Sequence, residues 1–188
     1  MQEAHELFPA RSALVPLTAL WLVALVGIFA FGGITLRSFC GMLFTAVLLW
    51  LSFLDLRDGM LYDVITLPFA AAGIALSLMG VLVPVENALI GGTLCGVLFY
   101  CLYIAARGGL GGGDVKLAAG LGLWLGWEAA IIAVWIAFLL GGMAAALLLI
   151  TRRRRRQDAL PFGPFLAVGG YVGFVAGARL WQLYWGLP

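Results

Sequence analysis

Long runs of apolar residues, each about 20 residues in length, divide this chain at short polar links. The runs are continuous and do not alternate with period two, so they predict helices rather than strands of a barrel. A helix of about 20 residues is long enough to cross the hydrocarbon core of a bilayer. The segment over 114–126 is short for a full crossing, so we expect it to be tilted or partly shielded from lipid. The expected helices cover residues 13–35, 39–56, 65–83, 87–106, 114–126, 129–150 and 163–184.

The composition excludes a soluble globular domain, because 64% of the 188 residues are hydrophobic and only 11% are charged. A soluble protein of this size has a largely polar surface, which this chain cannot supply. Lipid offers no hydrogen-bond partners to an open backbone, so the spans must be helical. We therefore predict an all-α fold: a polytopic membrane helix bundle with about six or seven transmembrane helices, in which residues 1–188 form a single domain.

The basic residues predict the orientation of the bundle, because cytoplasmic loops are enriched in Lys and Arg. We interpret the run Arg152 to Arg156 as a cytoplasmic topology anchor and not as a lipid-headgroup or nucleic-acid site, so no nucleic-acid partner is expected. Alternation of the helices then leaves only Arg37 and Arg179 outside. The other basic residues expected inside are Arg11, Arg57, Arg107 and Lys116.

Two aspartates stand at helix ends on this predicted cytoplasmic side. Asp55 ends the segment 39–56, and Asp114 begins the segment 114–126 after a loop that contains five glycines between Gly108 and Gly113. Glycines permit a close approach of another chain. Two carboxyl groups a few ångströms apart in a poorly hydrated site cannot both ionise easily, so one stays protonated near neutral pH. Such a pair can activate a water against a peptide bond: the carboxylate accepts a proton from the water, while the acid polarises the carbonyl and later protonates the departing amine.

Each of these features also has a structural interpretation, and the pattern alone leaves both open. An aspartate at a helix N-terminus often serves as a cap, which fits Asp114. Asp55 can pair with the nearby Arg57. Glycines in membrane helices usually serve close packing.

Metal and nucleophile chemistry have no support in the sequence. Cys40, Cys95 and Cys101 lie in apolar segments without CxxC spacing, and His5, the only histidine, lies in the N-terminal tail. No GxSxG motif is present. We therefore expect no metal site, no disulfide framework and no cofactor.

The segment GGGD at 111–114, followed by VKLAAGLGLWLG, resembles the second active-site motif of the type IV prepilin peptidases, the bacterial GxGD intramembrane aspartic proteases. The segment from Asp55 through Asp63 to Pro68 resembles their first aspartate motif, and the two aspartates are separated by 59 positions (114 − 55). The segment PFGPFLA at 161–167 resembles their C-terminal FGP motif. Tyr62 departs from the pattern, since the family often has proline there.

The resemblance implies that Asp55 and Asp114 are the catalytic pair of an aspartic endopeptidase. Its implied substrates are prepilins or pseudopilins, whose basic leader is removed at the cytoplasmic face of the bacterial inner membrane. That location agrees with the orientation derived from the arginines. Supporting or substrate-binding roles are implied for Arg57, Asp63, Gly111, Gly112, Gly113 and Lys116.

Long members of this family carry an N-terminal cytoplasmic region, often with a tetracysteine zinc site, that is linked to N-methylation. Only about 12 residues precede the first expected helix here, and no CxxC pair is present. The expectation is therefore a short, peptidase-only form without S-adenosylmethionine binding. Two rival hypotheses are an ion-coupled transporter, which predicts acids at mid-membrane on broken helices, and a non-catalytic assembly partner of a pilus or secretion system.

Overall fold

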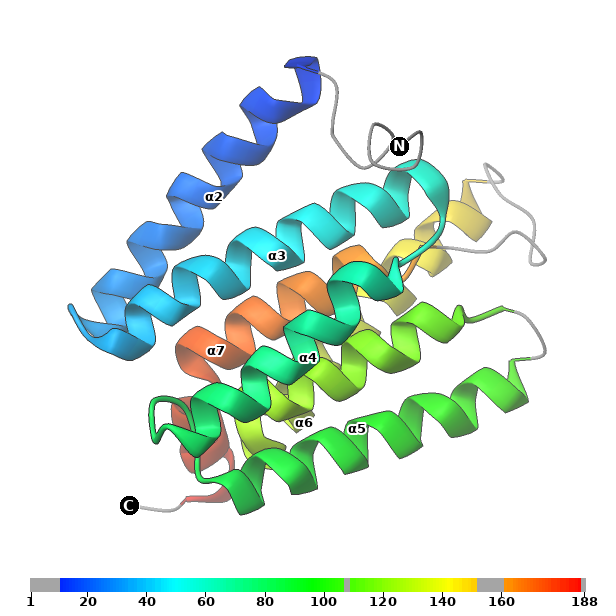
Figure 1. The fold of residues 1–188 in the computed structure, drawn as a ribbon. Helices are drawn as coiled ribbons and strands as arrows, with labels where there is room; N and C mark the ends of the chain where they lie inside the picture. The colour runs from blue at the N-terminus through cyan, green and yellow to red at the C-terminus, as the bar shows by residue number, and fades with distance from the viewer. Residues whose placement is uncertain (1–10, 107–108, 152–160, 187–188) are drawn as a thin grey trace.

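The computed structural model describes residues 11–106, 109–151 and 161–186, which fold into six helices (Figure 1). No strand occurs in these ranges. Five of the six helices are long and apolar enough to cross a membrane. The predicted all-α polytopic bundle is therefore confirmed. The helices are α2 (Arg11–Gly32), α3 (Leu36–Asp58), α4 (Asp63–Leu78), α5 (Val85–Ala105), α6 (Gly112–Ile150) and α7 (Gly163–Trp185).

The longest helix, α6, is folded back on itself. A straight helix of its 39 residues would be about 58 Å long, nearly twice the thickness of the hydrocarbon core. Its helical geometry breaks at Gly126, where φ is 76° and ψ is 170°. Asp114, before the break, lines a pocket with Phe162, and Gly141, after the break, packs against the same ring. The two halves therefore run in opposite directions, and both ends of α6 lie on the same side of the bundle in Figure 1. The predicted division into 114–126 and 129–150 is confirmed.

Helix α4 is shorter than the sequence pattern predicts. Its 16 residues end at Leu78, whereas the apolar run continues to residue 83. The chain turns at Gly80, which has a φ of 71°. Glycine adopts this left-handed backbone conformation without a steric penalty, because it has no Cβ. Hydropathy alone did not locate this turn, because the residues on both sides of it are apolar.

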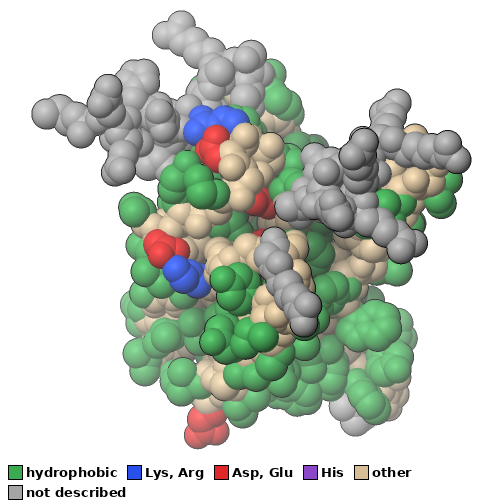
Figure 2. All heavy atoms as spheres, turned by 90° about the vertical axis from the view of Figure 1, so that its right-hand side faces the viewer, with side chains coloured by type: hydrophobic (Ala, Val, Ile, Leu, Met, Phe, Trp, Pro, Cys, Tyr) green, Lys and Arg blue, Asp and Glu red, His purple; other side chains and the backbone are tan. Residues whose placement is uncertain are grey.

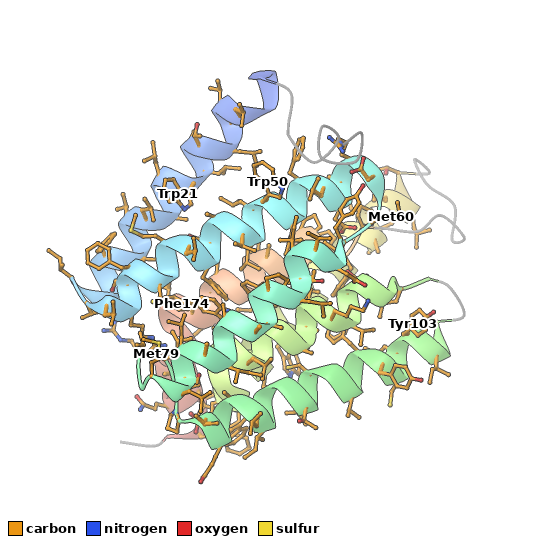
Figure 3. All side chains as sticks on the ribbon, in the orientation of Figure 1. Trp21, Trp50, Met60, Met79, Tyr103 and Phe174 are labelled. Carbon is orange, nitrogen blue, oxygen red and sulfur yellow. The ribbon has the colours of Figure 1, made fainter. Side chains whose placement is uncertain are left out.

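An aromatic cluster joins four helices in the core. The ring of Phe44 on α3 lies 5.0–5.6 Å from the rings of Phe69, Trp124 and Phe174, which belong to α4, α6 and α7. The indole N–H of Trp124 donates to the backbone oxygen of Phe69 at 2.7 Å. Buried aromatic side chains contribute large apolar areas, so this cluster fixes the four helices that carry the charged residues discussed below. Figure 3 shows Phe174 pointing from α7 into this interior.

Helix α2 lies at the edge of the bundle. Figure 1 shows it splayed away from α3 toward its N-terminus, and only a small part of its surface is buried. Trp21 reaches from α2 toward α3 (Figure 3), where its indole N–H donates to the backbone oxygen of Met42 at 3.0 Å. The aspartate pair therefore depends on α3, α4, α6 and α7 rather than on α2.

The bundle has two chemically different ends. The first, which we call the aspartate end, holds Asp55 and Asp114 at the C-terminus of α3 and the N-terminus of α6. The second, the opposite end, holds Arg37 and Arg179, near the start of α3 and the end of α7. This arrangement matches the alternation of helix ends predicted from the sequence.

The break in α6 provides a test of the fold. Gly126→Ala should lower the apparent melting temperature of the detergent-solubilised protein by several degrees. The reason is that alanine is strained by about 1–3 kcal/mol in this backbone conformation, and its Cβ would lie 3.1 Å from Oδ1 of Asn87. Gly142→Ala is the matched control, because a Cβ there meets nothing within 4 Å. Equal melting temperatures for the two variants would contradict the hairpin.

Candidate active site

Asp55 lies in the last turn of α3 and is only 5% exposed. The helix ends at Asp58, and its C-cap, Gly59, has a φ of 66° and donates its N–H to the backbone oxygen of Asp55. The side chain of Asp55 turns toward α7, where its Oδ2 accepts a hydrogen bond of 2.7 Å from the N–H of Gly163. A Cβ on residue 163 would lie 2.7 Å from that same oxygen. The absence of a side chain at Gly163 therefore allows the two helix ends to meet.

Asp114 lies in the first turn of α6 and is 6% exposed. Its Oδ2 accepts a hydrogen bond of 3.1 Å from the N–H of Gly111, the N-cap residue. The capping interpretation is thus correct for this oxygen, and the helix dipole favours a carboxylate there. The other oxygen, Oδ1, is buried and has no hydrogen-bond partner in the described part of the chain. A buried acceptor without a partner is costly, so capping alone does not account for Asp114.

Both carboxyl groups line one pocket of about 390 Å³ at the aspartate end. The pocket lies between the C-terminus of α3, the N-terminus of α6 and the segment that precedes α7. Figure 2 shows this end of the molecule, with acidic side chains on a largely apolar face and basic side chains beside some of them. The remaining described residues that line the pocket are Gly59, Met60, Leu61, Gly109, Gly111, Gly112, Gly113, Pro161 and Phe162.

Arg57 pairs with its neighbour Asp58 and not with Asp55. Its Nε and Nη2 donate to the two carboxylate oxygens of Asp58 at 2.7 and 2.9 Å. The phenol of Tyr62 also donates to Asp58, at 3.3 Å. The alternative that Asp55 serves as the ion-pair partner of Arg57 is therefore wrong, and Asp55 faces the pocket instead.

Asp63 and Lys116 pair with each other. The ammonium of Lys116 lies 2.7 and 2.6 Å from the two carboxylate oxygens of Asp63, and joins the first turns of α4 and α6. Both side chains are about half exposed, at 52% and 44%, and neither lines the pocket. Exposed ion pairs contribute about 0–1 kcal/mol. The two residues thus sit beside the pocket as a link between helices.

The three glycines before Asp114 differ in their surroundings. Gly113 packs on Leu61, where a Cβ would lie 2.6 Å from the leucine Cβ. Gly111 is the N-cap and supplies the N–H to Asp114. A Cβ on Gly112 would meet nothing within 4 Å. Close packing therefore explains Gly113, while Gly112 leaves open space at the pocket.

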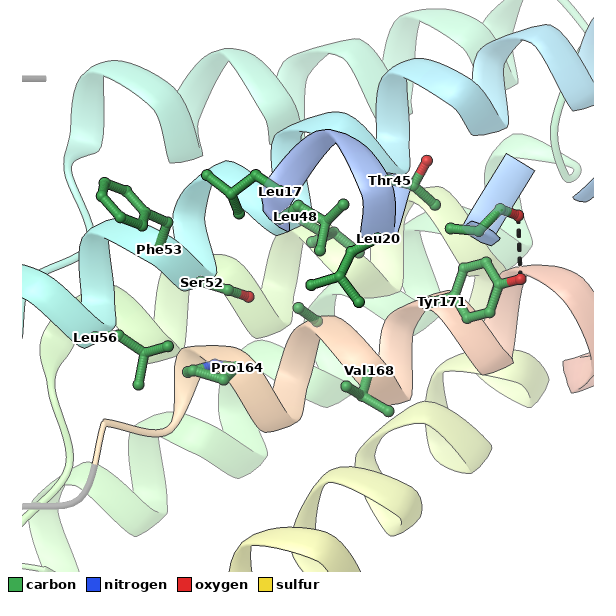
Figure 4. A pocket seen from close by; sticks show the side chains of 13 residues that line it. Leu17, Leu20, Thr45, Leu48, Ser52, Phe53, Leu56, Pro164, Val168 and Tyr171 are labelled. Carbon is green, nitrogen blue, oxygen red and sulfur yellow. Dashed lines mark hydrogen bonds between the residues drawn. The ribbon is translucent and has the colours of Figure 1, made fainter. Parts of the chain in front are cut away.

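A second cavity, of about 340 Å³, lies between α2, α3 and α7 (Figure 4). Its lining is apolar apart from the hydroxyls of Thr45, Ser52 and Tyr171, and the phenol of Tyr171 donates to the backbone oxygen of Ala24 at 3.1 Å. None of its described lining residues carries a carboxylate. The described lining of this cavity therefore offers no pair of carboxyl groups for acid–base chemistry.

The described residues contain no cluster of three or more His, Cys, Asp or Glu side chains that could hold a metal ion. Sequence reasoning did not identify the donor that holds Asp55, the backbone N–H of Gly163. The FGP motif at 161–167 marked the segment, but a backbone donor cannot be recognised from side-chain types.

Comparison with known proteins identifies the family. The model of the type IV leader peptidase family matches residues 42–146, which is more than half of the chain and includes both Asp55 and Asp114. The chain belongs to the type IV leader peptidase family. No solved structure matches it.

Two relatives in this family illustrate the extent of the similarity. A prepilin leader peptidase/N-methyltransferase of Aeromonas hydrophila is 35% identical over 181 residues, which cover 93% of this chain and 61% of the relative. A protein of the same name from Burkholderia pseudomallei (strain 1026b) is 39% identical over 147 residues, covering 75% of this chain and 47% of the relative. The chain thus spans about half to three fifths of the length of these relatives.

The contact between Asp55 and Gly163 gives a test of the site. Gly163→Ala should destabilise the protein by about 1–3 kcal/mol, because the new Cβ displaces a buried carboxylate from its hydrogen-bond donor. In an Asp55→Ala background the same change should cost less, since the carboxylate is gone and only the Cβ of residue 55, 3.1 Å from the new Cβ, stays close. The check is a double-mutant cycle measured by thermal unfolding in detergent. Additive effects of the two substitutions would show that the contact is not formed.

Proposed function

We propose that this protein is an aspartic endopeptidase that removes the leader peptide of type IV prepilins or pseudopilins, with Asp55 and Asp114 as its catalytic pair. The observation that carries the proposal is that two buried carboxyl groups, 59 residues apart in the sequence (114 − 55), line one pocket. The unpaired Oδ1 of Asp114 supports it, because a water or a peptide group in the pocket would supply the missing partner. Family membership and the names of the relatives agree with it.

The proposed reaction needs only the two carboxyl groups and a water. Two carboxylates in one poorly hydrated pocket repel each other, so the pair holds one proton between its members. The ionised member accepts a proton from the water as the water oxygen attacks the peptide carbonyl carbon, and the protonated member donates to the carbonyl oxygen. Collapse of the tetrahedral intermediate breaks the C–N bond, and the amine leaves with a proton from the pair.

The surroundings of the pair would position an extended peptide. The glycine segment of Gly111, Gly112 and Gly113 lines the pocket, and the open space at Gly112 leaves room for a substrate backbone. The Gly163 N–H holds Asp55 in place. In this proposal, the Asp63–Lys116 and Arg57–Asp58 pairs hold the surrounding helix ends and do not contact the reacting atoms.

We place the protein in the bacterial inner membrane, with the aspartate end facing the cytoplasm. The basic residues support this orientation, because nine of the eleven Lys and Arg residues belong to segments assigned to that side by the alternation of the helices. Asp58 and Asp63 at this end are already paired with Arg57 and Lys116, so electrostatic attraction of a basic leader would come from the ionised carboxylate of the catalytic pair.

The decisive variants are Asp55→Asn and Asp114→Asn, each co-expressed with a candidate prepilin. Either change should reduce leader removal at least about a hundredfold, because an amide neither accepts nor donates the transferred proton. Leader removal is measured by the mass of the pilin, and insertion by the amount of enzyme in the membrane fraction.

Glu86→Gln is the matched control, since it makes the same acid-to-amide change in the first turn of α5, away from the pocket, and should leave processing intact. Wild-type processing by an inserted Asp114→Asn protein would reject the catalytic pair. It would favour a non-catalytic assembly partner or an ion-coupled transporter instead.

A further inference from the structure

Arg37 and Arg179 are the two exceptions to the charge asymmetry of the chain. Nine of the eleven basic residues fall on the side of the aspartate end by the alternation of the helices, and these two fall on the other. Basic residues on that side oppose the usual orientation preference of membrane proteins. They are 142 residues apart in the sequence (179 − 37), yet they line the same pocket.

This pocket has a volume of about 370 Å³ and lies between the ends of α2, α3 and α7. Each guanidinium is held over an aromatic ring of another helix. The Cζ of Arg37 lies 5.4 Å from the ring centroid of Phe174, and the Cζ of Arg179 lies 5.6 Å from that of Phe31. Cation–π contacts of this kind orient a guanidinium without neutralising it.

Neither arginine has a carboxylate partner within the described ranges, where the two ion pairs are Arg57–Asp58 and Lys116–Asp63. Glu86 and Glu128 belong to α5 and α6 at the same end of the bundle, and neither lines the pocket. Two positive charges therefore line one partly enclosed space, and none of the described residues that line it carries a carboxylate. Arg37 also lies in the first turn of α3, where the helix dipole disfavours a cation.

We infer that the pocket between Arg37 and Arg179 binds the phosphate group of an anionic phospholipid in the leaflet opposite the aspartate end. A guanidinium presents a fork of N–H donors that matches phosphate oxygens, and two forks from different helices can hold one phosphate. The remaining lining is largely apolar and includes Ile28, Phe31, Phe174 and Val175, which suits the glycerol and first methylenes of a lipid rather than a free inorganic anion. This inference is independent of the proposed peptidase activity.

The test uses the protein of residues 1–188, delipidated in a neutral detergent, and follows its apparent melting temperature. Phosphatidylglycerol added to the micelles should raise that temperature, because a ligand that binds only the folded state stabilises it. Phosphatidylcholine, whose phosphate is offset by its own cation, should have a much smaller effect. Equal effects of the two lipids would overturn the inference. A full effect of millimolar inorganic phosphate alone would show that the pocket takes a free anion, and would overturn the lipid assignment.

The double variant Arg37→Gln, Arg179→Gln should weaken phosphatidylglycerol binding at least about tenfold, since charge-assisted hydrogen bonds to the phosphate are lost. Removing these two charges strengthens the cytoplasmic bias of the remaining basic residues, so the variant should insert in the same orientation. The control Arg57→Gln removes a charge that Asp58 already pairs, and should retain the response. An unchanged response of the double variant in native mass spectrometry, with phosphatidylglycerol still bound, would contradict the inference.

Discussion

The arrangement of this protein depends on placing two carboxyl groups where water is scarce. A buried carboxyl group is unfavourable unless the protein supplies hydrogen bonds to it. Asp55 accepts a hydrogen bond from the N–H of Gly163, and Asp114 accepts one from the N–H of Gly111. Both donors belong to the backbone at the start of a helix, so the cost of burial is offset by groups that would otherwise lack partners. Among the described residues, Oδ1 of Asp114 has no hydrogen-bond partner, and this oxygen is the one available for a ligand.

The helical hairpin of α6 also helps to hold the two carboxyl groups at the aspartate end. Its turn at Gly126 returns the second half of the helix to the aspartate end, so that Gly141 packs on Phe162 beside the pocket. The aromatic cluster of Phe44, Phe69, Trp124 and Phe174 then holds α3, α4, α6 and α7 in register. The fold thus brings two helix ends from distant parts of the chain to one pocket.

Much of this organisation could be predicted from the sequence, because membrane helices are governed by length and hydropathy. The helical class, the division of α6 at Gly126 and the common location of Asp55 and Asp114 all follow from apolar runs and their alternation. The end of α4 at Leu78 could not be found in this way, since the following turn is apolar.

The pairings between side chains also could not be predicted from the sequence pattern. Arg57 is near both Asp55 and Asp58 in the sequence. Only the structure shows that Asp58 is its partner, because the side chain of Asp55 turns toward α7. The pairing of Lys116 with Asp63, across 53 residues, depends on how α4 packs on α6. The convergence of Arg37 and Arg179 on one pocket likewise needs three helices to be placed together.

The central claim is that the side chains of residues 55 and 114 share one pocket, and proximity cross-linking tests it most directly. The background replaces Cys40, Cys95 and Cys101 with alanine and carries Asp55→Cys and Asp114→Cys. A short bifunctional thiol reagent should join the two new cysteines in membranes, as seen by peptide mass spectrometry. The pair Asp55→Cys and Arg179→Cys, at opposite ends, should not be joined. The account is contradicted if residues 55 and 114 remain unlinked although each reacts with a monofunctional reagent.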